Sequence, residues 1–233
     1  MNAFDWLAGR STPLALVIFD CDGVLVDSES IANRVVAASL SELGWEMTAQ
    51  QAENRFIGMT LPDMVPLIAA HLGYQPPPDW PDLLLERISS ALREESVLIP
   101  GALEALDGVD ALGLPWRIAS NSSHAEMRAK FVRTGLIERV CGRVHSFEDV
   151  PRGKPAPDLF LSAAAAQGVP PEMCIVVEDS IPGATGAAAA GMGCLGFAPY
   201  GDGAGLRATG AVTFPAMSEL PSLFAAAPRR RAA

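Results

Sequence analysis

Six short apolar runs along the chain predict β-strands. They cover residues 14–19, 116–119, 143–145, 174–177, 194–198 and 211–214. Several of these runs are apolar at every position, which is typical of strands that are covered on both faces within a parallel sheet. The pattern therefore predicts a parallel sheet buried between two layers of helices.

Helical patterns alternate with the later strands. They cover residues 102–111, 123–134, 158–167 and 181–190. Because each such helix can return the chain to start a parallel neighbouring strand, the alternation predicts a doubly wound, Rossmann-like α/β core.

The alternation is interrupted once, between residues 28 and 96, where no good strand pattern occurs. Helix-like stretches at 30–43, 49–56, 62–71 and 80–93 fill this interval, with turn signals between them. We expect residues 28–96 to form an inserted α-helical cap domain, and residues 1–27 and 97–233 to form the α/β core.

Composition and charge exclude several classes of protein. The chain has 233 residues, 49% of them hydrophobic, and a net charge of −10. Binding to nucleic acid needs clustered Lys and Arg, so this balance argues against a nucleic-acid partner, and we interpret the basic run at 229–231 as a solvated chain end. The sequence has neither an apolar run of membrane-spanning length nor a secretion-type start, and its four cysteines are widely spaced. We therefore expect a cytoplasmic protein with reduced thiols and no membrane partner.

Two carboxylates follow the first predicted strand, in the segment Asp20-Cys21-Asp22-Gly23. Alternate residues of an extended strand point to the same side, and open α/β sheets bind ligands beyond the carboxyl ends of their strands. A carboxylate can attack phosphorus, and a second one can transfer the proton of the leaving group. The alternative is that both acids only end a strand and cap a turn, and this fragment alone does not decide between the two.

The strand at 116–119 ends in hydroxyl and amide groups. Ser123 and Glu126 form a plausible capping box for the helix that follows. Capping accounts for Ser123, but it leaves Ser120 and Asn121 free to donate hydrogen bonds to a phosphoryl oxygen.

Lys154 lies on a stiff loop, between Gly153 and Pro155, just before a predicted helix. Most surface lysines are only solvated, and that interpretation is open here as well. The position of this loop between two of the motif-bearing strands favours contact with a bound phosphate.

The strand at 174–177 ends in Glu178 and Asp179. Adjacent acids repel each other unless a cation lies between them, and Mg²⁺ prefers oxygen ligands. The alternative is that the two acids only favour the N-terminus of the following helix.

Taken together, these motifs resemble those of the haloacid dehalogenase-like (HAD) hydrolase superfamily, and the resemblance covers nearly the whole chain. The four motifs occur in the family's order, as Asp20-x-Asp22-Gly23, Ser120-Asn121, Lys154-Pro155 and Glu178-Asp179. The helical insertion is similar to the family's cap. Within the superfamily, the segments 20–29, 177–180 and 183–192 are typical of the β-phosphoglucomutase and sugar-phosphate phosphatase group.

The resemblance implies a role for each matched residue. It implies that Asp20 is the nucleophile and that Asp22 protonates the leaving oxygen and then deprotonates water. It also implies that Ser120 and Lys154 hold the phosphoryl group. The acid at position 22 favours phosphate esters over haloacids, because the dehalogenating branch of the family generally lacks it.

The resemblance further implies a magnesium site. Its ligands would be Asp20, the backbone carbonyl of Asp22, Glu178 and Asp179. A dianionic substrate would be repelled by so many carboxylates unless a cation and a lysine balanced the charge.

Two departures from the mutase pattern bear on the reaction. Leu61, in the segment Gly58-Met59-Thr60-Leu61, stands where the mutases have an arginine for the second phosphate, and Ala32 stands where they have a histidine. We therefore expect a monomeric, magnesium-dependent phosphatase of a small phosphorylated metabolite, such as a sugar or sugar-acid phosphate. The alternatives are a β-phosphoglucomutase-like phosphomutase and a non-catalytic module that binds phosphorylated ligands.

Overall fold

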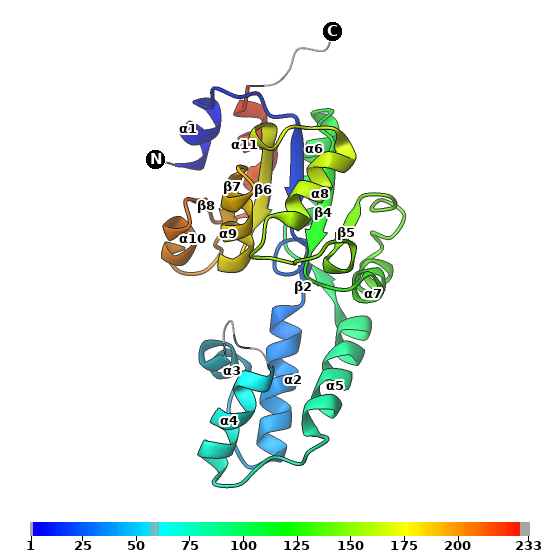
Figure 1. The fold of residues 1–233 in the computed structure, drawn as a ribbon, viewed down its shortest axis with the longest axis vertical. Helices are drawn as coiled ribbons and strands as arrows, with labels where there is room; N and C mark the ends of the chain where they lie inside the picture. The colour runs from blue at the N-terminus through cyan, green and yellow to red at the C-terminus, as the bar shows by residue number, and fades with distance from the viewer. Residues whose placement is uncertain (1, 57–58, 60, 229–233) are drawn as a thin grey trace. The chain divides into compact units, whose positions relative to one another are not determined.

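The computed structural model describes residues 2–56, 59 and 61–228, and the chain divides into two compact units (Figure 1). One unit comprises Met1–Val26 and Leu98–Ala233, and the other comprises Asp27–Val97. The strands β2 (Val26–Asp27) and β3 (Val97–Leu98) pair with each other where the chain passes from one unit to the other.

A six-stranded sheet in the order β5-β4-β1-β6-β7-β8 forms the centre of the first unit, and all of its neighbouring strands are parallel. The strands are β1 (Leu16–Phe19), β4 (Trp116–Ser120), β5 (Val144–Ser146), β6 (Cys174–Glu178), β7 (Gly193–Phe197) and β8 (Val212–Phe214). This arrangement confirms the predicted doubly wound parallel sheet. The observed boundaries differ from the predicted ones by up to two residues.

Helices cover both faces of this sheet. Four of them, α1 (Ala3–Ala8), α6 (Ala102–Ala111), α7 (His124–Thr134) and α11 (Leu220–Ala226), share one apolar cluster with Val17 and Phe19 of β1. Three others, α8 (Asp158–Gln167), α9 (Ile181–Ala189) and α10 (Ala204–Ala208), share a second cluster with Leu16 and Ile18. Successive β1 residues thus enter opposite layers, which explains why the strand is apolar throughout. Short 3₁₀ turns occur at Phe147–Asp149, Pro171–Met173 and Met217–Glu219.

The second unit is helical, as predicted for the insertion. Its helices are α2 (Glu29–Glu42), α3 (Ala49–Phe56), α4 (Leu61–Leu72) and α5 (Trp80–Glu95). They enclose their own apolar cluster, which includes Leu40, Ile68 and Trp80. The Trp80 indole nitrogen donates a hydrogen bond to the hydroxyl of Ser39 (2.9 Å), so the polar atom of the largest core side chain is satisfied.

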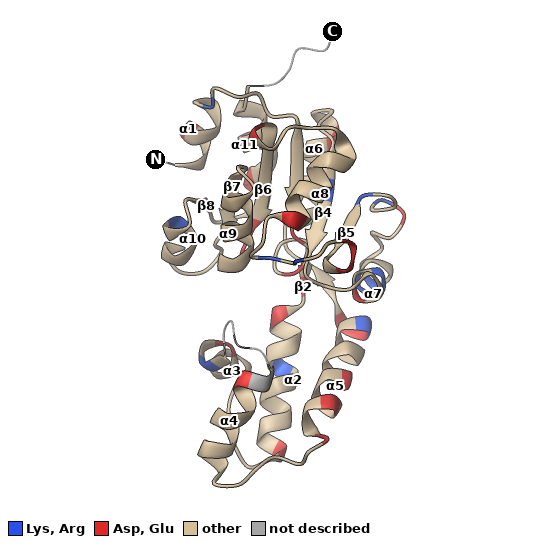
Figure 2. Cartoon of the chain, viewed as in Figure 1, with Lys and Arg blue, Asp and Glu red and all other residues tan. Residues whose placement is uncertain are grey.

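Other sequence predictions can be compared with the fold. Cys174 and Cys194 are buried, and the four cysteines are free thiols. Within the described part of the chain, no helix combines the length and the hydrophobicity that crossing a bilayer requires. Asp and Glu are spread over both units, in keeping with the net charge of −10 (Figure 2). The basic run at 229–231 lies outside the described residues.

Candidate active site

The candidate site lies where three adjacent strands end. Asp20 follows β1, Ser120 is the last residue of β4, and Glu178 is the last residue of β6. Because Phe19 pairs in register with both Ile118 and Val177, the three strands end at the same edge of the sheet. The three polar residues therefore meet there, as the motif positions predict.

Lys154 joins two of these strand ends. Its Nζ donates to Asp20 Oδ1 (2.7 Å) and to Glu178 Oε1 (2.6 Å). The three side chains are nearly buried, with exposed fractions of 4% for Lys154, 9% for Asp20 and 0% for Glu178. Buried charges in such numbers are stable only when paired and hydrogen-bonded, so this ammonium is essential to the cluster.

Asn121 holds the backbone of Lys154. Its Nδ2 donates to the Lys154 carbonyl (3.0 Å), and its Oδ1 accepts from the Lys154 N–H (2.8 Å). A Cβ at Gly153 would lie 2.5 Å from the same Oδ1, so glycine is needed for this approach. The structure thus gives Asn121 a contact that sequence reasoning missed, while its predicted bond to a phosphoryl oxygen stays a prediction.

Two glycines make room for the acids at the end of β6, Glu178 and Asp179. Gly23 has a φ of +73°, and a Cβ at this position would lie 1.9 Å from Asp179 Oδ2. A Cβ at Gly183 would lie 1.7 Å from Glu178 Oε1. Any side chain at either position would displace one of the carboxylates.

Glu178 is also oriented by the start of α9. Its Oε2 accepts hydrogen bonds from the Ser180 N–H (2.7 Å) and from the Ser180 hydroxyl (2.8 Å). The same hydroxyl caps the helix by accepting from the Gly183 N–H (3.1 Å). Helix capping and orientation of the acid are therefore achieved by one side chain.

The carboxylates of Asp20, Glu178 and Asp179 can offer one oxygen each within 4.8 Å of one another. Lys154 contacts two of these acids, Asp20 and Glu178, and three carboxylates gathered beside this ammonium favour the binding of a further cation. An all-oxygen group of this kind fits a hard divalent cation such as Mg²⁺. The side chain of Asp22 is not part of this group.

The Asp22 carboxylate instead contacts a second buried ammonium. Lys130 Nζ lies 2.5 Å from Asp22 Oδ1, and the hydroxyls of Ser122 and Ser120 donate to Oδ2 at 2.7 Å and 3.3 Å. Sequence reasoning missed Lys130. Its position on α7, at helical spacing from the buried Met127, was the available signal, because a lysine on an apolar helix face needs a partner.

Burial and neighbouring charges shift the ionisation of these groups. Desolvation is the main cause that raises the pKa of Asp20 to about 7, with help from the charges of Glu178 and Asp22 and against the effect of Lys154. Burial alone would lower the pKa of Lys154, but the adjacent Asp20 and Glu178 raise it above its ordinary value. The pKa of Lys130 is likewise raised, because Asp22 outweighs the effect of burial. Both lysines are therefore cations at neutral pH.

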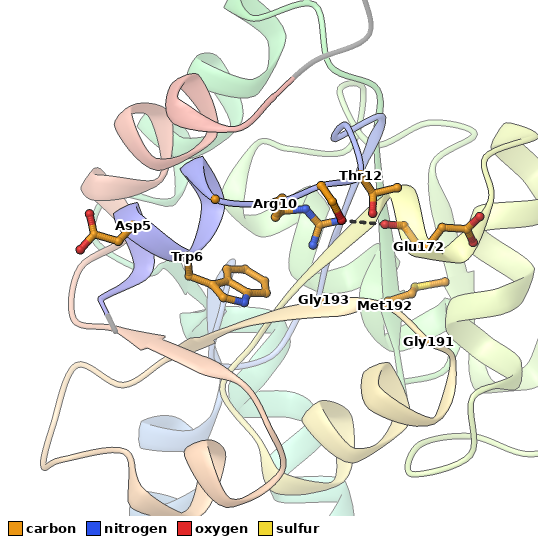
Figure 3. A pocket seen from close by; sticks show the side chains of 10 residues that line it. Asp5, Trp6, Arg10, Thr12, Glu172, Gly191, Met192 and Gly193 are labelled. Atoms are coloured by element: carbon orange, nitrogen blue, oxygen red, sulfur yellow. Dashed lines mark hydrogen bonds between the residues drawn. The ribbon is translucent and has the colours of Figure 1, made fainter.

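A pocket of about 550 Å³ lies elsewhere on the same unit (Figure 3). Its lining includes Arg10, Trp6, Glu172 and Gly193. Arg10 donates to the Glu172 carbonyl (2.7 Å), and its Nε is a buried nitrogen without a hydrogen-bond partner. Gly193 begins β7 and Glu172 precedes β6, so the pocket is at the amino ends of the strands and is distinct from the candidate site.

Comparison with known proteins agrees with this geometry. Residues 14–191 match the family model of the haloacid dehalogenase-like hydrolases. The chain is 30% identical to the 6-phosphogluconate phosphatase of Escherichia coli K12, over 90% of this chain and 94% of that protein.

Two solved structures share the fold over almost their whole length. One is a HAD family hydrolase from Deinococcus radiodurans with bound phosphate and sodium, with a TM-score of 0.82 and 33% identity over 93% of this chain and 97% of that one. The other is a β-phosphoglucomutase candidate from Thermotoga maritima, with a TM-score of 0.77 and 25% identity over 91% of this chain and 99% of that one. The chain therefore belongs to the haloacid dehalogenase-like hydrolases, and it is an enzyme related to the sugar-phosphate phosphatases and β-phosphoglucomutases among them.

Proposed function

We propose that the protein is a magnesium-dependent phosphatase that hydrolyses a sugar or sugar-acid phosphate through an aspartyl-phosphate on Asp20. The observation that carries this proposal is the buried cluster in which Lys154 contacts Asp20 and Glu178, beside Asp179. A nucleophilic acid, a fixed cation and an acidic ligand set together meet the main needs of phosphoryl transfer, which are alignment and charge stabilisation.

In the first step, a carboxylate oxygen of Asp20 forms a bond to phosphorus while the ester P–O bond breaks. The departing oxygen takes a proton from the carboxyl group of Asp22, and the alcohol leaves. In the second step, water attacks the phosphorus and gives a proton to Asp22, and the bond between Asp20 and phosphorus breaks. Ester and water thus become alcohol and inorganic phosphate, and Asp22 regains the proton it lost.

Asp20, Glu178, Asp179 and the backbone carbonyl of Asp22 would hold the Mg²⁺ ion. When bound, the ion supplies positive charge that offsets the repulsion between these acids and the phosphate dianion. Lys154 and the hydroxyl of Ser120 would hold the oxygens of the transferring group, since both are donors at the edge of the sheet where Asp20 lies.

The helical unit is proposed to act as the cap, formed by residues 28–96. Caps of this kind exclude water from the reaction and supply contacts to the part of the substrate that is not transferred. The cap is therefore where selectivity among phosphorylated metabolites would be found.

A β-phosphoglucomutase-like reaction is the second candidate, and the similarity to the Thermotoga maritima structure favours it. Against it stands Ala32 in α2, where a mutase has histidine. The predicted difference at Gly58-Met59-Thr60-Leu61 falls on a segment in which residues 58 and 60 lie outside the described residues. We prefer hydrolysis for two reasons. A mutase must retain a bisphosphate intermediate, and the residue differences disfavour this. The 6-phosphogluconate phosphatase is also similar to this protein over most of both chains.

The test is release of inorganic phosphate from a panel that includes 6-phosphogluconate, hexose phosphates, polyol phosphates and nucleotides. We expect release with Mg²⁺ and none with EDTA or in Asp20→Asn. Interconversion of hexose 1- and 6-phosphates after priming with a bisphosphate, without net release, would identify a mutase instead. Tight ligand binding with neither reaction would identify a non-catalytic binding module.

A further inference from the structure

Two of the donors that hold the side chain of Asp22, Lys130 and Ser122, lie outside the four family motifs. Lys130 Nζ contacts Oδ1 at 2.5 Å, and it also donates to the Ser122 hydroxyl at 3.0 Å. Because an ammonium has no acceptor, the Ser122 hydroxyl is left to direct its own proton to Asp22 Oδ2, at 2.7 Å. Lys130 and Ser122 therefore form a two-point clamp on one carboxylate.

Packing alone does not account for Lys130. Its side chain is 4% exposed, whereas that of Asp22 is 26% exposed, so the lysine is the more deeply buried partner. The neighbouring positions on this face of α7 are occupied by the apolar Met127 and Phe131. Burying an ammonium is unfavourable unless it is paired, and an apolar residue would fill the same space without that penalty.

The two acids at the end of β1 have separate cationic partners. Lys154 contacts Asp20 and Glu178, and Lys130 contacts Asp22. Lys130 therefore contacts Asp22, the residue proposed to transfer protons, and Lys154 contacts the proposed nucleophile Asp20 and the acidic ligand Glu178.

We propose that Lys130 is a positioning residue that, with Ser122, fixes the Asp22 carboxyl group for proton transfer to the leaving oxygen. This inference rests on the proposed phosphatase reaction. The two contacts fix the plane of the carboxyl group, because Oδ1 faces the Lys130 ammonium and Oδ2 faces the hydroxyls of Ser120 and Ser122. Lys130 itself neither gains nor loses a proton during turnover.

Leaving-group dependence distinguishes this role from a structural one. We would measure kcat/KM with Mg²⁺ for phenyl phosphate and for p-nitrophenyl phosphate, which are similar in size. Phenolate is as basic as the tyrosine side chain, with a pKa of about 10, and needs a proton to leave. Nitrophenolate is a much weaker base and leaves without one.

In Lys130→Met we expect kcat/KM for phenyl phosphate to fall about 100-fold, which is the lower end of what a general acid contributes. For p-nitrophenyl phosphate, which needs no general acid, we expect a fall of less than about three-fold. Lys130→Arg, which keeps a cation, should restore much of the lost rate. In the Asp22→Asn background, Lys130→Met should have little further effect, because the residue acts through Asp22. Should Lys130→Met not fold, Ser122→Ala carries the same test in the same direction.

Arg139→Met is the matched control, because Arg139 makes two ion pairs with Asp107 and Asp110 (2.7 and 2.6 Å) that do not involve the site residues. It should leave the ratio of the two kcat/KM values unchanged. An equal fall for both esters in Lys130→Met, or no fall for either, overturns the role of Lys130 while the phosphatase stands. No phosphate release from either ester by the wild-type protein would overturn the phosphatase itself.

Discussion

Lys154 is the residue on which the charge balance of the candidate site depends most directly. Its ammonium contacts Asp20 and Glu178 at 2.7 and 2.6 Å, and all three side chains are buried. A cation that already neutralises two carboxylates can also attract the oxygens of a phosphate dianion. We therefore expect the Lys154 ammonium to contribute both to the stability of the fold and to the binding of the phosphate.

Lys154→Ala is expected to raise KM and lower kcat together, with kcat reduced roughly 10²- to 10³-fold, as for other lost electrostatic contacts in active sites. It should also cost about 3–5 kcal/mol of folding free energy, because two buried carboxylates lose their partner. Steady-state kinetics and urea unfolding measure the two effects. Arg152→Ala, on the same loop with a 71% exposed side chain, is the control. An unchanged kcat in Lys154→Ala would refute its contact with the transferring phosphate.

Gly183→Ala provides a second test at the scale of one residue. Alanine is favoured over glycine within a helix by up to about 1 kcal/mol, yet its Cβ would lie 1.7 Å from Glu178 Oε1. We expect the variant to need a higher Mg²⁺ concentration for half-maximal activity and to have a lower kcat, as seen in a magnesium titration. Gly186→Ala, in the same helix with nearest contacts of 3.2 Å, should be milder. Equal magnesium dependence in the two variants would contradict a role for the Glu178 position.

At the scale of elements, the sequence predicts the strand ends well and the contacts between elements poorly. Asp20, Ser120 and Glu178 could be placed together because parallel strands in register end at one edge of the sheet. Lys130 and the backbone contact of Asn121 could not, since each depends on how a helix or loop packs against a distant segment. The two-residue strands β2 and β3 were missed for a different reason, because so short a segment shows no periodicity.

The edge strand β5 contains a buried histidine that its neighbours keep neutral. Arg117 donates to His145 Nε2 (3.3 Å), and Ser162 pairs with Nδ1 (3.3 Å). A guanidinium can only donate, so Nε2 must accept and cannot also carry a proton without disrupting this contact. Burial is the largest cause of the lowered pKa of His145, followed by the charge of Arg117.

This lowered pKa has a definite consequence for stability. As pH falls below about 6.5, the unfolded chain binds a proton at His145 before the folded protein does, so the free energy of unfolding decreases. We expect His145→Gln to lose less stability than the wild type between pH 8 and pH 5, measured by urea unfolding. Other titrating groups are common to both proteins and cancel in the comparison. Parallel pH profiles for the two proteins would disprove this assignment.

For the whole molecule, the acidic cluster links metal binding to folding. Asp20, Glu178 and Asp179 belong to the unit that contains the sheet, so a bound cation would stabilise that unit as a whole. With the pKa of Asp20 raised to about 7, the metal-free folded protein retains a proton that the unfolded chain has lost, and its stability decreases as pH rises toward 7. A cation binds the ionised carboxylate and must displace this proton.

Mg²⁺ should therefore raise the melting temperature, and more at pH 8 than at pH 6. At a hundred-fold excess over its dissociation constant a ligand adds about 2.7 kcal/mol, which is roughly 5–10 °C for a domain of this size. Asp179→Asn should reduce this rise in melting temperature, because it removes one carboxylate from the ligand set, whereas Asp107→Asn, at an exposed position of α6, should not. Thermal unfolding of each protein with Mg²⁺ and with EDTA gives the two melting temperatures to be compared. Equal melting temperatures in the two conditions at pH 8 would mean that the cluster holds no magnesium, and the proposed charge balance at Asp20 would then fail.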